Sequence, residues 1–147
     1  MMRTACLAVL AALFCAAELP ADLKRALAEP NLERRSALAL DNASTVLKAA
    51  RTAYDKGETG EVGKEIDEIL ESVNLAATSL EQSGKNPRRS DWFKKAEIST
   101  RDLSRRIQSF QDDMSFTDRA LLDKLKARVQ EVHDQLLLGV MEGKKKQ

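Results

Sequence analysis

The sequence predicts an all-α fold: an antiparallel up-down-up-down four-helix bundle with a short additional N-terminal helix, after a cleaved signal peptide. Three observations lead to this prediction. Apolar residues recur every three or four positions from about residue 31 to residue 140, which is the period of an amphipathic helix. No segment after residue 17 alternates with the two-residue period of a strand. Residues 1–17 have the composition of an export signal.

The predicted signal peptide comprises residues 1–17. Arg3 supplies the positive charge, Ala5–Phe14 forms the apolar stretch, and the small residues before Glu18 suit cleavage there. The apolar stretch is about half of the roughly 20 residues that span a bilayer, so we expect no stable membrane insertion after cleavage. Two alternatives remain: acylation of Cys15, although bulky Phe14 precedes it, and an uncleaved anchoring segment.

The cysteine positions and the charge balance limit the cellular location and the types of partner that we expect. Cys6 and Cys15 both lie in the signal peptide, so the mature chain is expected to have neither a disulfide nor a reactive thiolate. An exported chain without a cysteine framework suggests a periplasmic or extracellular location, in a bacterial envelope. The 24 Lys and Arg nearly balance the 23 Asp and Glu, which argues against a nucleic-acid partner.

The short opening helix is predicted within residues 18–30. Pro20 suits a first turn, and Pro30 ends the helix because proline disfavours helical geometry in the residue before it. Leu19, Leu23 and Leu27 share one face. We expect that face to cover Leu137 and Leu138, which project beyond the apolar stripe of the last helix.

The four-helix bundle domain is predicted over residues 31–143, followed by a basic tail at 144–147. Asn31 is the expected N-cap of the first long helix, and Gly57 and Gly60 mark the first turn. The four helices are expected over residues 31–56, over 61–82, from Ser90 and from Thr117. Their predicted buried stripes are Leu32, Leu40, Ala43, Leu47, Ala50 and Tyr54; Val62, Ile66, Ile69, Val73, Ala76 and Leu80; Phe93, Ala96, Thr100, Leu103, Ile107, Phe110 and Met114; and Leu122, Leu125, Val129, Val132, Leu136 and Val140.

These stripes are narrow seams, which favour lengthwise packing at about 20°. Short connections make neighbouring helices antiparallel. Two long hairpins that pair only in a homodimer are the alternative arrangement. Thr100 and Tyr54 are the only polar residues placed near the seams, so a dry core is expected.

Few residues of the sequence have the type and spacing that a catalytic or metal site needs. His133 is the only histidine, beside the seam of the last helix, where an ordinary hydrogen bond is the expected role. Zinc sites usually combine several His or Cys ligands, and serine catalysis needs a dedicated base. The sequence therefore predicts a non-enzymatic protein with no catalytic residue, metal site or cofactor.

Charge is unevenly distributed. Residues 58–82 contain seven acids and one base, whereas residues 85–106 contain eight bases and three acids. The first interpretation is a pair of adjacent helices that attract each other, with i,i+4 pairs of Glu97 with Arg101 and of Asp102 with Arg106. The second is a docking surface for an acidic partner, because Ile98 points outward among bases and Trp92 lies nearby. The residues of this predicted surface are Lys85, Arg88, Arg89, Trp92, Lys94, Ile98, Arg101 and Arg105.

The function expected from the sequence is that of an exported structural or protein-interaction module of the bacterial cell envelope. Its partner would be an envelope protein that the sequence does not identify. The alternative function is that of a small-molecule-binding or sensory bundle of the periplasm, because bundle interiors can hold ligands between their helices.

Overall fold

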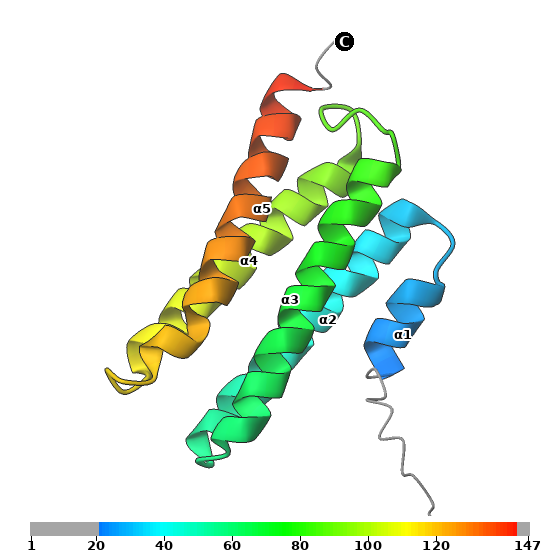
Figure 1. The fold of residues 1–147 in the computed structure, drawn as a ribbon. Coiled ribbons are helices and arrows are strands. Elements are labelled where there is room, and N and C mark those ends of the chain that lie inside the picture. Colours follow the sequence, from blue (N-terminus) through cyan, green and yellow to red (C-terminus); the bar gives the residue numbers. More distant parts are fainter. Residues whose placement is uncertain (1–20, 144–147) are drawn as a thin grey trace, which may run out of the picture.

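The computed structural model describes residues 21–143, and over this range every regular element is helical (Figure 1). The predicted all-α fold is confirmed. In chain order the elements are α1 (Ala21–Ala28), α2 (Leu32–Asp55), α3 (Thr59–Gln82), α4 (Asp91–Asp113), the 3-10 helix η1 (Arg119–Leu122) and α5 (Asp123–Glu142). The predicted signal peptide 1–17, the first residues of the opening helix and the tail 144–147 lie outside the described residues.

The long helices form two hairpins. One pairs α2 with α3, and the other pairs α4 with α5 (Figure 1). The hairpins contact each other because α2 also packs on α4 and α3 on α5. All four helices contribute side chains to a single apolar core. None of the helices described is long and apolar enough to cross a membrane.

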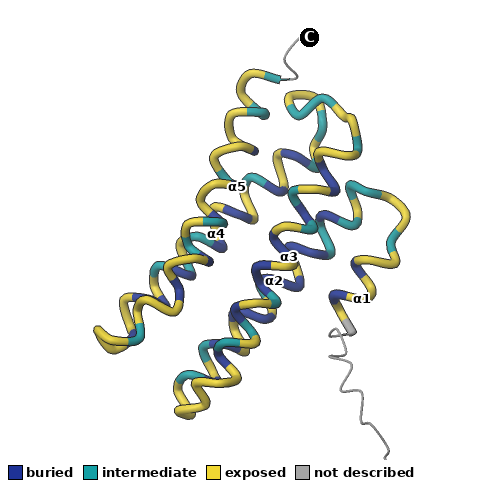
Figure 2. Tube along the Cα trace, in the orientation of Figure 1, coloured by how far each residue is buried: buried dark blue, intermediate teal, exposed yellow. Residues whose placement is uncertain are grey.

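The predicted seams become this core almost without exception. Every seam residue of α3 and α4 is buried, and so are those of α5 up to Leu136 (Figure 2). Only Leu32, Tyr54 and Val140, at the ends of their seams, are half-buried. The three-four spacing therefore identifies the inward face of each long helix correctly.

The connections follow local backbone chemistry. Asn31 caps α2 as predicted, because its side chain accepts a hydrogen bond from the Arg34 backbone N–H at 2.9 Å. Gly57 ends the hairpin turn with φ +76°, a left-handed conformation that glycine adopts without strain. The prediction for Gly60 is wrong: α3 already begins at Thr59, so Gly60 lies in its first turn.

The last helix also begins later than predicted. Thr117 stays in the turn, η1 follows, and α5 starts only at Asp123. Gln111 explains this start: its side-chain amide donates to the Arg119 carbonyl at 2.9 Å and to Asp123 Oδ1 at 2.7 Å. These bonds hold the chain in a tight 3-10 turn before the α-helix begins.

The expectation that Thr100 and Tyr54 are the only polar residues near the seams is wrong as well. Asn42 is only 4% exposed, and its amide donates to Ser72 Oγ and Glu68 Oε1, both at 2.9 Å, between α2 and α3. Ser36, Ser79 and Gln111 are buried too. Asn42 escapes a search for apolar stripes because its polar side chain occupies a position that the period leaves between seam residues.

The predicted cover for Leu137 and Leu138 is also wrong. The opening helix α1 packs on α2, and Figure 1 shows α1 and α5 on opposite sides of the molecule. Leu23 and Ala26 of α1 are buried there, whereas Leu27 remains exposed. Leu137, Leu138 and Met141 therefore form an exposed apolar strip near the end of α5.

Candidate functional site

The charged helices do not neutralise each other as the first interpretation expected. The acidic α3 packs mainly on α2, and α4 packs mainly on α5 and α2. The described residues show no ion pair between α3 and α4. Of the two predicted i,i+4 pairs, Glu97 and Arg101 lie 3.5 Å apart, but Arg106 instead donates to Ser44 on α2. The bases of residues 85–106 are therefore not neutralised by α3, and Lys94 and Arg101 instead pair within α4, with Asp91 and Glu97.

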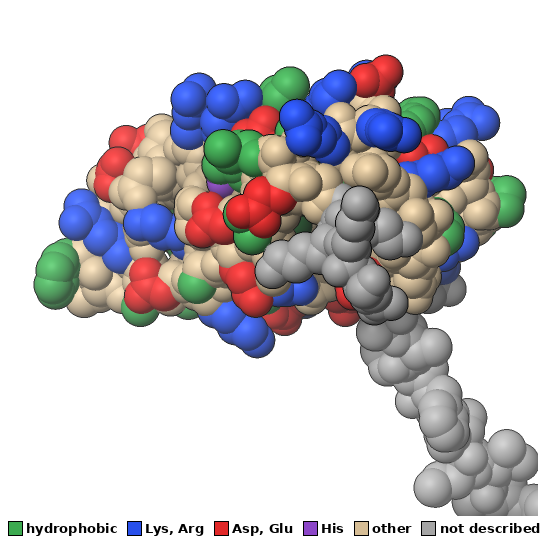
Figure 3. Space-filling model, turned by 90° about the horizontal axis from the view of Figure 1, so that it is seen from above, with side chains coloured by type: hydrophobic (Ala, Val, Ile, Leu, Met, Phe, Trp, Pro, Cys, Tyr) green, Lys and Arg blue, Asp and Glu red, His purple; other side chains and the backbone are tan. Residues whose placement is uncertain are grey.

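The structure leaves seven of the eight predicted docking residues exposed and one, Trp92, half-buried. Lys85, Arg88 and Arg89 are exposed in the α3–α4 loop. On α4, Lys94, Arg101 and Arg105 are exposed around Ile98, whose own exposed fraction is 53%. Figure 3 shows Lys and Arg side chains gathered along one edge of the molecule, with hydrophobic side chains between them. The exposure of these side chains agrees with the sequence, and the binding surface itself stays a prediction.

Trp92, in the first turn of α4, lies beside these exposed bases. Three grooves share it as a lining residue: one between α2 and α4, one against the α3–α4 loop and one beside α1. The Lys95 ammonium lies 5.1 Å from the centroid of the indole ring, within the range of a cation–π contact. A half-buried Trp beside bases is the type of residue that anchors protein interfaces.

The groove between α2 and α4 has a volume of about 280 Å³. Its walls are mainly apolar, formed by Ala37 and Leu40 of α2 and by Trp92, Ala96 and Ile98 of α4. Ser36 also lines it, and its buried Oγ is the one such side-chain atom in the described residues without a hydrogen-bond partner. Lys95 and Asp41 supply the charged rim.

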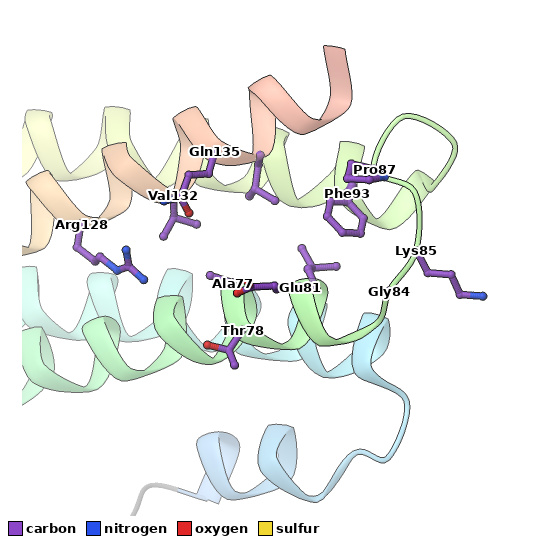
Figure 4. Close-up of a pocket in the computed structure, with 12 residues that line it drawn as sticks. Ala77, Thr78, Glu81, Gly84, Lys85, Pro87, Phe93, Arg128, Val132 and Gln135 are labelled. Carbon is purple, nitrogen blue, oxygen red and sulfur yellow. The ribbon is translucent and has the colours of Figure 1, made fainter. Parts of the chain in front are cut away.

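A larger groove of about 510 Å³ runs between α3, α5 and the α3–α4 loop (Figure 4). Leu80, Phe93, Val132 and Leu136 form its apolar floor. Its polar edge consists of Thr78, Glu81, Lys85, Arg128 and Gln135. In Figure 4 Lys85 extends away from the cavity.

Arg128 is held in place at the edge of that groove. Its Nε donates to Asn74 Oδ1 of α3 at 2.7 Å, and its guanidinium pairs with Glu131 at 2.8 Å. At the other end, Gly139 of α5 approaches Pro87 so closely that an added Cβ would lie 3.2 Å from the Pro87 Cβ. The two contacts fix the walls of the groove at both ends.

His133 makes a hydrogen bond of the kind that the sequence predicted. Its Nε2 lies 3.0 Å from Glu97 Oε1, and both side chains are almost buried between α5 and α4. Glu97 also pairs with Arg101. Among the residues described, no group of three or more His, Asp or Glu side chains could hold a metal ion.

One exposed side chain was missed by the search of the sequence. Phe116, in the turn between α4 and η1, is 87% exposed. A hydrogen-bond network fixes the turn: the Ser115 backbone N–H donates to the Tyr54 hydroxyl at 3.0 Å, and that hydroxyl donates to Asp118 at 2.9 Å. An aromatic residue just outside a helical pattern, in a stretch of polar residues, is the sequence signal that could have identified it.

Comparisons of this chain with protein families, curated proteins and solved structures find no match.

Proposed function

We propose that this chain is an exported, non-enzymatic helical-bundle protein that acts as a structural or protein-interaction module of the bacterial cell envelope. In this proposal residues 1–17 are a cleaved signal peptide, and α2 to α5 form an antiparallel up-down-up-down bundle within one chain. The observation that supports it best is the surface around α4, where exposed bases surround exposed Ile98 and half-buried Trp92.

This surface suits an acidic protein partner. The bases of α4 and of the preceding loop attract an acidic surface from a distance, and apolar groups in the grooves provide contact area after docking. Exposed ion pairs alone contribute little, typically about 0–1 kcal/mol each, so the grooves at Trp92 must supply much of the affinity.

The test compares two triple variants of the chain isolated from its own cells, analysed by native mass spectrometry. Arg88→Glu, Arg89→Glu and Arg101→Glu reverse the proposed surface. Lys56→Glu, Lys64→Glu and Lys124→Glu apply the same change in charge near the hairpin turns at the opposite end. We expect a bound acidic protein with the wild type and the control, but not with the first variant, while both variants remain helical.

A partner that survives the first triple change would assign binding to another surface. The same spectra give the mass of the mature chain. A mass corresponding to residues 18–147 supports cleavage before Glu18, whereas an added acyl mass on Cys15 supports lipid attachment.

The α3–α5 groove favours a second candidate function, the binding of a small molecule. Its volume of about 510 Å³ lies within the range of roughly 300–1,000 Å³ that is usual for ligand pockets, and its floor is apolar. In that case the chain isolated from its cells would retain a small molecule. Ala77→Phe, at the wall of the groove, would displace it, whereas Ala49→Phe on the exposed face of α2 would not.

A further inference from the structure

Phe116 and the groove between α2 and α4 lie at opposite ends of α4. The groove involves residues 92–99, near the start of the helix, and Phe116 follows its last residue. A helix of 23 residues is roughly 35 Å long, so Phe116 cannot reach the groove of its own chain. An aromatic side chain and an apolar recess are thus both open to another molecule.

Phe116 is presented by a rigid turn. Besides the bonds through Tyr54, the Ser115 hydroxyl donates to Asp118 Oδ2 at 2.7 Å. The Tyr54 ring packs edge-on against Phe110, with centroids 5.7 Å apart, which ties the network to the core. A fixed turn loses little conformational entropy on binding, so its exposed ring is prepared for insertion.

The groove is large enough for that ring. A cavity of about 150 Å³ lined by apolar side chains can bind benzene, and this groove measures about 280 Å³. The unpaired Ser36 Oγ at its wall is already removed from water. An incoming apolar ring therefore adds no desolvation penalty at that atom.

The charges around the two features are opposite. Asp112, Asp113 and Asp118 lie within four residues of Phe116, and the bases beside them are Arg119 and Arg51 of α2, which pairs with Asp113. The groove has Lys95 and Asp41 on its rim, and the exposed bases Lys94, Arg101 and Arg105 lie around Ile98 at its α4 wall. Charge therefore favours the approach of the Phe116 turn toward the groove and disfavours contact between two like ends.

We propose that copies of this chain associate head to tail, with Phe116 of one copy inserted between α2 and α4 of the next. The inference rests on the proposed function, because it names a second copy as a partner of the Trp92 surface. The contact joins two different surfaces, so it can continue into open chains or close into rings. It also accounts for an exposed aromatic side chain that the core does not need.

The first measurement is sedimentation velocity of the chain isolated from its own cells, over a range of concentrations. We expect species larger than a monomer, whose proportion falls as salt rises because screening weakens the opposite charges. Phe116→Ala should raise the dissociation constant about thirtyfold, the loss typical of an aromatic hot spot. Met141→Ala, which removes another exposed side chain near the end of α5, is the matched control and should have no effect.

The decisive test mixes two variants. Phe116→Ala removes the inserted side chain but keeps the groove, whereas Ile98→Asp places an acid on the groove wall and keeps Phe116. Each variant alone should be a monomer with unchanged helicity, since both residues are exposed. An equimolar mixture should form a dimer and nothing larger, because only one groove and one Phe116 remain compatible.

Three results would overturn the inference: a wild type that stays monomeric, an association that Phe116→Ala leaves unchanged, or a mixture that remains monomeric. Loss of association in Met141→Ala would assign the contact to α5 instead. A monomeric wild type that still holds an acidic protein, lost on reversal of Arg88, Arg89 and Arg101, would retain the proposed function while excluding self-assembly.

Discussion

The two hairpins use the same periodic pattern but side chains of different size. On α2 four of the nine buried residues are alanine (Ala39, Ala43, Ala50 and Ala53), whereas α4 buries Phe93, Leu103, Ile107 and Phe110. Small side chains let helices approach closely, and large ones fill the space between helices that lie further apart. We therefore expect larger buried side chains to destabilise the first hairpin. Smaller buried side chains, which leave cavities, should destabilise the second.

Their polar contacts are also placed differently. In the α2–α3 hairpin, Asn42 bonds to Ser72 and Glu68 in the interior of both helices. In the α4–α5 hairpin, Gln111 acts at the turn, through the Arg119 carbonyl and Asp123. A buried polar side chain within a seam can fix the register of two helices. The second hairpin also has a polar contact between its helices, from His133 to Glu97, so we infer that it is aligned both from within and from its turn.

Phe110→Ala should produce the largest loss, in the hairpin with large side chains. Phe110 is fully buried and contacts the ring of Tyr54. Removing it leaves a cavity, and such changes typically cost about 3–5 kcal/mol of unfolding free energy. Urea denaturation followed by circular dichroism measures the loss. Phe116→Ala, at an exposed phenylalanine, is the control and should change stability by less than about 0.5 kcal/mol.

Ala43→Leu tests the opposite failure in the first hairpin. Ala43 is completely buried between packed helices, so a larger side chain forces its neighbours apart. Overfilling of this kind costs about 1–3 kcal/mol. Ala49→Leu, on the exposed face of the same helix, should be nearly neutral in the same urea titration. Equal effects at both positions would contradict tight packing around Ala43.

Tyr54→Phe tests a contact that joins the hairpins. The hydroxyl of this α2 residue bonds to Ser115 and Asp118 beyond α4, while the ring contributes to the core. Since the ring remains, only the hydrogen bonds are lost, at about 0.5–1.5 kcal/mol each. Hydrogen exchange should rise in the Phe116 turn more than in α3. Unchanged exchange there would show that the network does not hold the turn.

Glu65→Gln should have the smallest effect on stability, and the size of that effect depends on pH. Burial first, and then the nearby Glu68 and Glu61, raise the pKa of Glu65 above its usual 4.5. The folded state thus holds this proton more tightly than the unfolded chain does. The contribution of Glu65 to the stability of the folded state is most favourable below pH 4.5, and it is lost as the pH rises through the raised pKa. At pH 7 the Gln variant should be slightly more stable than wild type, and the gap should close under acid.

The helices and their inward faces could be predicted because the apolar period is local information. Each seam residue of α3 and α4 is buried as predicted. Which helices are neighbours depends on contacts between distant residues, so the placement of α1 and the relation between α3 and α4 could not be derived in this way. The exposed ring of bases around Ile98 followed from helical angles alone. The grooves at Trp92 did not, because they require α1, α2 and α4 together.

Trp92 is the only tryptophan in the chain, and it borders three grooves at once. The intrinsic ultraviolet emission of the protein therefore originates at the surface to which we assign binding. Burial of the indole by a docked chain would shift that emission toward the blue, while the approach of a distant partner to any other face would leave the spectrum as it was. Trp92 thus acts as an intrinsic fluorescent probe of these grooves, and binding there can be followed without adding a dye or changing a residue.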